Sequence, residues 1–208
     1  MRDKLRFSAS VLCLLAAAIL LTIYLAWLFY PLEISYFALP DKVHLKAGTI
    51  QYNFNILMNY LTNPFSQKLS MPDFRSSAAG LHHFQAVKYL FHLAQAIFLV
   101  TLPALIFFIK KVVKKGFLAL YQRSLFILSV LPFVMICLAG LIGFNSFFTL
   151  FHQVLFVGDN TWLFDPAKDP VIWILPEEFF MHAFILFALL YEGIFLSLYF
   201  FSRKTRSQ

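Results

Sequence analysis

Four long apolar stretches separated by polar segments dominate the chain. They cover residues 7–30, 84–109, 118–150 and 176–201, and the first of them reads FSASVLCLLAAAILLTIYLAWLFY. Each stretch exceeds the roughly 20 residues that a helix needs to cross the hydrocarbon core of a bilayer. The pattern therefore predicts an all-α membrane protein with four transmembrane helices.

The segments between these stretches predict a small cap outside the membrane. Residues 31–82 have mixed character, and residues 151–175 are dense in turn-forming and aromatic residues. No internal repeat, low-complexity run or linker separates one part of the chain from another. We therefore expect a single integral membrane domain over residues 1–208.

One part of the predicted cap has the periodicity of an amphipathic helix. In YNFNILMNYL, apolar side chains recur three and four residues apart, at Phe54, Leu57, Met58 and Leu61. This spacing favours a short helix that lies on the membrane surface.

Basic residues accumulate at one side of the predicted helices. Of the 17 Lys and Arg, eleven lie before the first stretch, between the second and third, near the start of the third, or after the fourth. Cytoplasmic loops carry such an excess, so we expect both termini and the 110–117 loop in the cytoplasm. The net charge of +7 then reflects topology and attraction to anionic lipid, not nucleic-acid binding. The eleven residues are Arg2, Lys4, Arg6, Lys110, Lys111, Lys114, Lys115, Arg123, Arg203, Lys204 and Arg206.

The first apolar stretch follows basic residues, as the apolar region of a signal peptide does. It is longer than the about 7–15 residues typical of that region, and no small-x-small cleavage site precedes Pro31. We therefore expect this stretch to remain in the protein as a membrane anchor.

Composition supports the membrane assignment and narrows the function classes. Hydrophobic residues make up 61% of the chain and charged residues 13%, against about 45–50% and about 25% in soluble domains. No GxSxG elbow, HExxH motif, Walker loop or GxGxxG motif occurs. Cys13 and Cys137 fall in apolar stretches, which favours buried thiols over a disulfide or zinc site. Serine hydrolases, metalloproteases and nucleotide-binding proteins are thus unsupported.

Histidine is the residue type that indicates chemistry. His82 and His83 precede the second apolar stretch, and His152 lies at the outer end of the third. The predicted topology brings these residues to the same depth at the membrane surface. Imidazole titrates near neutral pH and therefore suits acid–base catalysis.

Two other interpretations of these histidines remain open. Interfacial histidines also anchor helix ends at the lipid headgroups, as Trp and Tyr do. A metal site would need a third ligand from His182, Asp165 or Glu177, which stand in no recognised metal-binding spacing. We expect neither a metal nor a cofactor.

Several acidic residues have structural interpretations. Asp165 and Asp169 each precede a proline, and Asp-Pro pairs are typical of turns. Glu192 lies within the fourth apolar stretch, where a carboxylate is a candidate for transport. We expect Glu192 instead to bond Gln122 or Arg123 on a neighbouring helix, because the predicted helices otherwise carry few charges.

Two stretches of the sequence resemble a known family. MPDFRSSAAGLHHFQAVKYLF and FHQVLFVGDNTWLFDPAKDPVIWILPEEFF are similar to the Gram-positive four-helix membrane proteins that include the lipoprotein intramolecular transacylase. The resemblance implies transfer of one acyl chain from the glyceryl sn-2 position of a diacylated lipoprotein. The acceptor is the α-amino group of the N-terminal cysteine, and the product is the lyso form.

The resemblance also implies a pair of catalytic histidines. The first stands in an H-apolar-x-Asp-Val-Lys pattern that matches His83 in HFQAVK rather than His82, and the second stands in FHQ, which matches His152. Ala86 occupies the place of the Asp in this pattern. A carboxylate that orients His83 is therefore missing or comes from elsewhere.

The implied reaction sets requirements on the rest of the site. Attack of the amine on the ester closes an eight-membered ring, so the flexible substrate must be held folded. We expect His152 to shuttle the proton, His83 to assist, and an aromatic pocket to hold the substrate. The candidate substrate-binding residues are Trp162, Phe84, Phe151, Asn160, Arg75 and Asp165.

The expected setting is the extracellular face of the cell membrane. There a monomer would act on a diacylglyceryl lipoprotein in contact with membrane lipid. A membrane acyl hydrolase and a non-catalytic bundle, such as a chaperone or sensor, remain the alternative functions.

Overall fold

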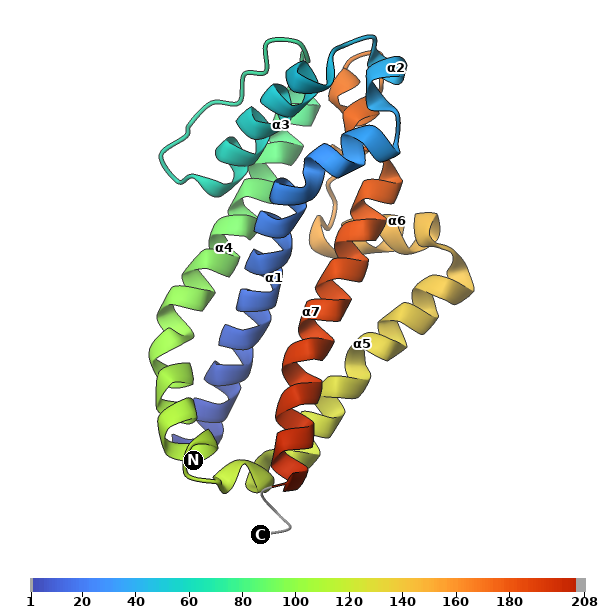
Figure 1. The fold of residues 1–208 in the computed structure, drawn as a ribbon. Helices are drawn as coiled ribbons and strands as arrows, with labels where there is room; N and C mark the ends of the chain where they lie inside the picture. The colour runs from blue at the N-terminus through green and yellow to red at the C-terminus, as the bar shows by residue number, and fades with distance from the viewer. Residues whose placement is uncertain (1, 205–208) are drawn as a thin grey trace. The chain divides into compact units, whose positions relative to one another are not determined.

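The structure, a computed structural model, describes residues 2–204 and is helical over most of that range (Figure 1). A π-helical turn at Ile109–Val113 and 3-10 turns at Phe117–Tyr121 and Pro170–Ile174 join longer helices. Arg206, one of the basic residues used to predict orientation, lies outside the described residues. The α-helices are α1 (Arg2–Tyr36), α2 (Leu39–Val43), α3 (Ala47–Thr62), α4 (Ala78–Phe108), α5 (Gln122–Ile142), α6 (Phe144–Leu155) and α7 (Glu177–Lys204).

Four helical stretches are long and apolar enough to cross a membrane, which confirms the predicted number. They are Arg2–Tyr36, Ala78–Val113, Phe117–Ile142 and Glu177–Lys204. The all-helical class is confirmed as well, because no strand occurs in residues 2–204. The cytoplasmic position of the termini and the extracellular cap stay predictions.

The third apolar stretch is divided between two helices. We predicted one helix over residues 118–150, but α5 ends at Ile142 and α6 begins at Phe144. Gly143 between them has φ +80° and ψ 150°, a conformation that glycine adopts readily and that interrupts a helix. The apolar run contains no signal for this break, because both helices are rich in Phe and Leu.

Contacts divide the chain into two compact units. Unit 1 contains the chain up to Thr22, Ala94–Phe144 and the chain from Phe184 onward, and unit 2 contains Ile23–Leu93 and Asn145–Ala183. The single-domain organisation stays a prediction.

Unit 1 consists mainly of apolar helix with little enclosed core. Phe108, Leu118, Leu125, Tyr191 and Phe195 form its buried cluster. Many other apolar side chains on α5 are exposed, among them Phe126 at 51% and Val134 at 56%. This is the surface expected of a helix whose solvent is lipid.

Glu192 of α7 belongs to unit 1 and differs from our expectation. Both of its carboxylate oxygens are buried without a hydrogen-bond partner among the described residues. The predicted bond to Gln122 or Arg123 is therefore wrong. Sequence position alone does not give the rotation of two helices about their axes, and this rotation decides which side chains meet.

Unit 2 has a continuous core in which α3 takes part. The ring of Tyr30 in α1 stacks on Phe54 of α3 at 3.5 Å, and its hydroxyl donates to the Ile174 carbonyl at 2.6 Å. The predicted α3 helix is confirmed, and its location at the membrane surface stays a prediction. Its apolar face packs into the core of unit 2 because other segments of the chain cover it. The buried residues of this face include Phe54, Leu57, Met58 and Leu61.

Candidate active site

Two buried histidines from different helices of unit 2 lie side by side. His83 is in the second turn of α4, and His152 is near the end of α6. Their ring centroids are 5.8 Å apart, and the residues are only 6% and 8% exposed. The structure thus brings together the two histidines that the sequence singles out.

Aromatic rings surround this pair. Trp162 stacks on His152 with ring centroids 4.8 Å apart, and Phe156 contacts both histidines, at 5.0 Å from His83 and 5.8 Å from His152. The histidines are therefore held in a setting poor in water. We call these side chains the aromatic cluster: Phe84, Phe148, Phe151, Phe156, Trp162 and Phe164.

A backbone bond fixes the proton of His152. Its Nδ1 lies 2.8 Å from the carbonyl oxygen of Phe148, one turn earlier in α6. A carbonyl only accepts, so the neutral ring carries its proton on Nδ1 and keeps the lone pair on Nε2. Burial lowers the pKa of His152 below its ordinary value of 6.5, although the Phe148 bond opposes this shift. The neutral ring, with a basic Nε2, is thereby favoured.

A ring nitrogen of His83 is also unpaired inside the aromatic cluster. The Nδ1 of His83 and the Nε1 of Trp162 are both buried without a hydrogen-bond partner among the described residues. A buried polar group without a partner costs about 1–3 kcal/mol. No described carboxylate bonds His83 or His152, so none replaces the Asp that the resemblance places at Ala86.

His82 has a different environment from its neighbour. Its side chain is 61% exposed, and Nε2 pairs with the Asp159 carboxylate at 3.1 Å. Hydrogen bonds from Thr161, helped by His82, hold the pKa of Asp159 below its ordinary value. His82 thus links α4 to the segment after α6 at the surface.

The predicted substrate-binding residues fall into two groups. Trp162, Phe84 and Phe151 belong to the aromatic cluster. The other three lie outside it: Asn160 is exposed, and Arg75 and Asp165 bond to backbone.

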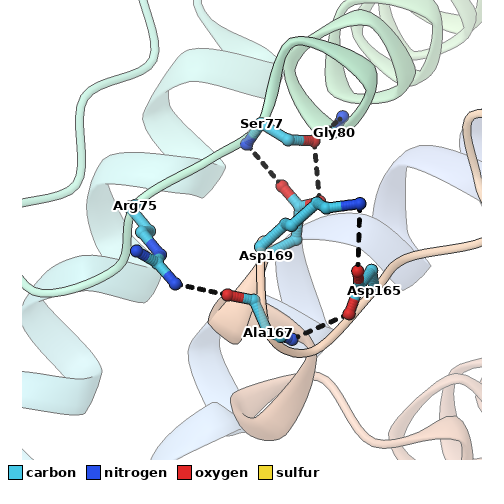
Figure 2. Close-up of polar contacts among 7 residues, drawn as sticks. Arg75, Ser77, Gly80, Asp165, Ala167 and Asp169 are labelled. Atoms are coloured by element: carbon cyan, nitrogen blue, oxygen red, sulfur yellow. Dashed lines mark hydrogen bonds and ion pairs between the residues drawn. The ribbon is translucent and has the colours of Figure 1, made fainter.

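Arg75 and Asp165 contact neither histidine in the structure. The Arg75 guanidinium donates to the Ala167 carbonyl, and an Asp165 oxygen accepts from the Ala167 amide at 3.0 Å (Figure 2). The Asp165 bond is the turn expected of this Asp-Pro pair. Bonds from Ala167 and Lys168 lower the pKa of the Asp165 carboxyl.

Asp169 is a polar residue of this region that sequence reasoning missed. It is only 3% exposed, and its carboxylate accepts from the amide and the hydroxyl of Ser77, at 2.6 and 2.7 Å (Figure 2). The Asp-Pro pattern indicates a turn, and the Asp169 amide indeed bonds the Asp165 carbonyl. The contact with Ser77 has no local signal, because its partners are far apart in the chain.

The residues considered for a metal site have other partners. His182 Nδ1 lies 3.0 Å from the Glu33 carboxylate, and Glu177 accepts from Asn145 at 2.8 Å. Within the described part of the chain, no group of three metal-ligating side chains gathers.

Known proteins resemble this chain in sequence and in fold. The family model of lipoprotein intramolecular transacylase Lit matches residues 5–180. A search of curated proteins finds no match. An in meso structure of the membrane integral lipoprotein intramolecular transacylase Lit from Bacillus cereus is 29% identical, with a TM-score of 0.83. The match covers 97% of this chain and 94% of that one.

Two further structures of the Bacillus cereus protein are also similar, and each carries a substitution of one histidine. The histidine-to-alanine variant is 27% identical, with a TM-score of 0.78, and the histidine-to-arginine variant is 26% identical, with a TM-score of 0.72. Each match covers 99% of this chain and 94% of the other.

Proposed function

We propose that this chain, which belongs to the lipoprotein intramolecular transacylase Lit family, converts diacylated lipoproteins to their lyso form. One acyl chain leaves the sn-2 glyceryl ester and joins the α-amino group of the N-terminal cysteine. The observation that carries the proposal is the buried pair of His83 and His152, 5.8 Å apart within the aromatic cluster. The chain is a multi-pass membrane protein, so an acylated substrate can reach it from the bilayer.

The amine of the substrate is the nucleophile, so the protein needs no nucleophile of its own. An α-amino group has a pKa of about 7.7–8.0 and is largely protonated at neutral pH. The fraction that has lost this extra proton to the surrounding water is the nucleophile, and as its C–N bond forms, Nε2 of His152 takes one further proton from the nitrogen. The same ring then returns a proton to the sn-2 oxygen as the C–O bond breaks. The step balances without water, cofactor or co-reactant.

His83 supports the developing negative charge. With its proton on Nδ1, the buried ring donates to the oxyanion of the tetrahedral intermediate. Trp162 Nε1, also buried and without a partner, provides a second donor toward the substrate. Donors that are fixed in advance stabilise a transition state strongly, and removing one such donor typically costs about 10²–10³ in kcat.

The aromatic cluster favours acyl transfer over hydrolysis. The eight-membered ring forms only when the substrate is folded, and preorganisation supplies up to about 7–11 kcal/mol in well-oriented reactions. Packed rings around His83 and His152 restrict the substrate and exclude the water that a hydrolase needs. A non-catalytic bundle gives no reason for burying two histidines side by side among aromatic rings.

The extracellular face of the cell membrane is the proposed side of the reaction. The basic residues around Lys110–Lys115 define the cytoplasmic side by the positive-inside rule, and both histidines lie at the other ends of the apolar stretches. There the acyl chains stay in lipid while the cysteine amine approaches from water. We expect the protein to act as a monomer.

Mass spectrometry of a synthetic diacylated lipopeptide tests the proposal. We expect the purified protein in detergent to move an acyl chain onto nitrogen, with no free fatty acid. A matched His44→Ala variant, changed at an exposed histidine, keeps this activity. Free fatty acid as the main product would indicate a hydrolase, and an unchanged lipopeptide would contradict the proposed function.

A further inference from the structure

A buried carboxylate joins two segments at the start of α4. Both oxygens of Asp169 are bonded to Ser77, one to its amide at 2.6 Å and the other to its hydroxyl at 2.7 Å. The Ser77 hydroxyl in turn accepts from the Gly80 amide at 3.0 Å and so caps the helix (Figure 2). Negative charge at a helix N-terminus is favourable, which explains how a carboxylate stays buried here.

Gly80 marks the closest approach of the two segments. A Cβ on Gly80 would overlap the Asp169 carboxylate and would lie 3.0 Å from Cε1 of the Phe164 ring. The segment that carries Phe164 and Asp169 therefore packs directly on the backbone of α4. Only glycine at residue 80 leaves room for this contact.

The same face of α4 carries His83. Residues three and four positions apart share a helix face, so Gly80, His83 and Phe84 form one ridge. Phe164 contacts this ridge, with its ring 5.5 Å from His83 and 5.3 Å from Phe84. The Asp169 carboxylate and the Phe164 ring thus contact adjacent turns of α4.

We propose that Asp169 is a positioning residue that clamps the 156–169 segment onto α4 and so keeps His83 enclosed by the aromatic cluster. The bonds to Ser77 hold the end of this segment, and Phe156, Trp162 and Phe164 within it cover the histidines. The role in catalysis rests on the proposed function, whereas the enclosure of His83 does not.

Chemical labelling of histidines tests the enclosure without any substrate. Diethyl pyrocarbonate modifies accessible imidazoles, and mass spectrometry gives a rate for each histidine. In the unaltered protein, His83 should react at least about ten-fold more slowly than exposed His44, because reaction requires local opening. His182, held by Glu33, reports on general loosening of unit 2.

Two variants release the clamp by different means. Asp169→Asn weakens the bonds to Ser77, and Gly80→Ala pushes the carboxylate and Phe164 away while it favours the helix itself. We expect both to raise the His83 rate at least about three-fold without changing that of His182. Ser76→Ala, beside the clamp but outside it, is the matched control and leaves both rates unchanged.

Activity measurements then separate positioning from substrate contact. Misplacement of a reacting group lowers kcat strongly, so Asp169→Asn and Gly80→Ala should each reduce kcat at least about ten-fold with little change in KM. A His83 that stays protected in both variants would overturn the proposal. Equal acceleration at His83 and His182 in both would overturn it too, because the clamp would then only support general stability. If the unaltered protein transfers no acyl chain, the proposed function fails, yet the labelling result still decides the clamp.

Discussion

Neighbouring histidines of this chain differ in what their ring nitrogens contact. His82 is exposed and paired with Asp159, whereas His83 is buried with a free Nδ1. His152 is buried too, but its Nδ1 is committed to the Phe148 carbonyl. Of these three histidines, His152 is the one whose Nδ1 proton is held by a carbonyl and whose Nε2 is left as a base.

Replacing His152 by alanine should reduce lyso-lipoprotein formation by about 10²–10⁴-fold, the usual contribution of a general acid–base residue. Expression and membrane insertion should be unaffected, because apolar helices drive both. The exposed His82→Ala variant is the control and should lose less than about five-fold, since an exposed ion pair contributes little. Mass spectrometry of lipoprotein N-terminal peptides from cells gives the ratio of the lyso form to the diacylglyceryl form for each variant. A larger loss from His82→Ala than from His83→Ala would contradict the choice of His83.

The pH dependence of the reaction should show two titrating groups. The rate falls first below the pKa of the substrate amine, about 7.7–8.0, with a slope of about one. Burial lowers the pKa of His152, so this base is still largely neutral at pH 6.5. The slope of the logarithm of the rate against pH therefore rises to about two only at a lower pH. Single-turnover rates from about pH 5 to 9 would show the break, and one uniform slope throughout would argue against a histidine base.

Among the helices, α3 shows that an apolar helix face can pack into the protein core. Its Leu57 side chain is 2% exposed among the residues that pack around Tyr30. Tyr52, on the opposite face of the same helix, is 58% exposed. The two faces therefore offer a direct test of whether α3 belongs to the protein core or to the lipid surface.

Leu57→Ala should lower the free energy of unfolding by about 2–5 kcal/mol, the usual result of truncating a buried leucine. Tyr52→Ala on the exposed face should change it much less. Denaturant unfolding in detergent, followed by circular dichroism, measures both values. Equal small losses would indicate that α3 is not packed as described.

The elements also show where sequence reasoning succeeds. Long apolar runs predict α1, α4, α5 and α7, because a helix must be long and apolar to cross a membrane. The break at Gly143 has no such signal, since Gly140 in the same apolar run lies within the unbroken part of α5. The burial of α3 and the Asp169 contact depend on partners distant in the chain. Histidines at matching depths could be predicted, but the hydrogen bond that fixes the proton of His152 could not.

For the whole molecule, orientation in the membrane decides which substrates can reach the histidines. The segment that includes Gln67 precedes α4 in the sequence, and the basic loop that includes Lys115 follows it. Both residues are exposed. The positive-inside rule places Lys115 in the cytoplasm. On this orientation we expect Gln67 and the histidine pair on the outside.

Cysteine labelling in cells tests this orientation. In a background with Cys13 and Cys137 replaced by alanine, a membrane-impermeant maleimide should label Gln67→Cys in intact cells. Lys115→Cys should react only after the membrane is permeabilised. The reverse pattern would place the histidines on the cytoplasmic side and contradict the proposed location.

Phe156 contacts both histidine rings, and we expect it to influence whether the acyl group goes to the substrate amine or to water. A histidine base that activates an amine can equally activate water, and liquid water is present at about 55 M against a single tethered amine. We therefore expect the phenylalanine rings around the pair to exclude water from the acyl group, a role distinct from that of Trp162 Nε1 as a donor. Phe156→Ala should divert part of the acyl group to free fatty acid, measurable beside the N-acylated product, and so give a lipase from a transferase by one truncation.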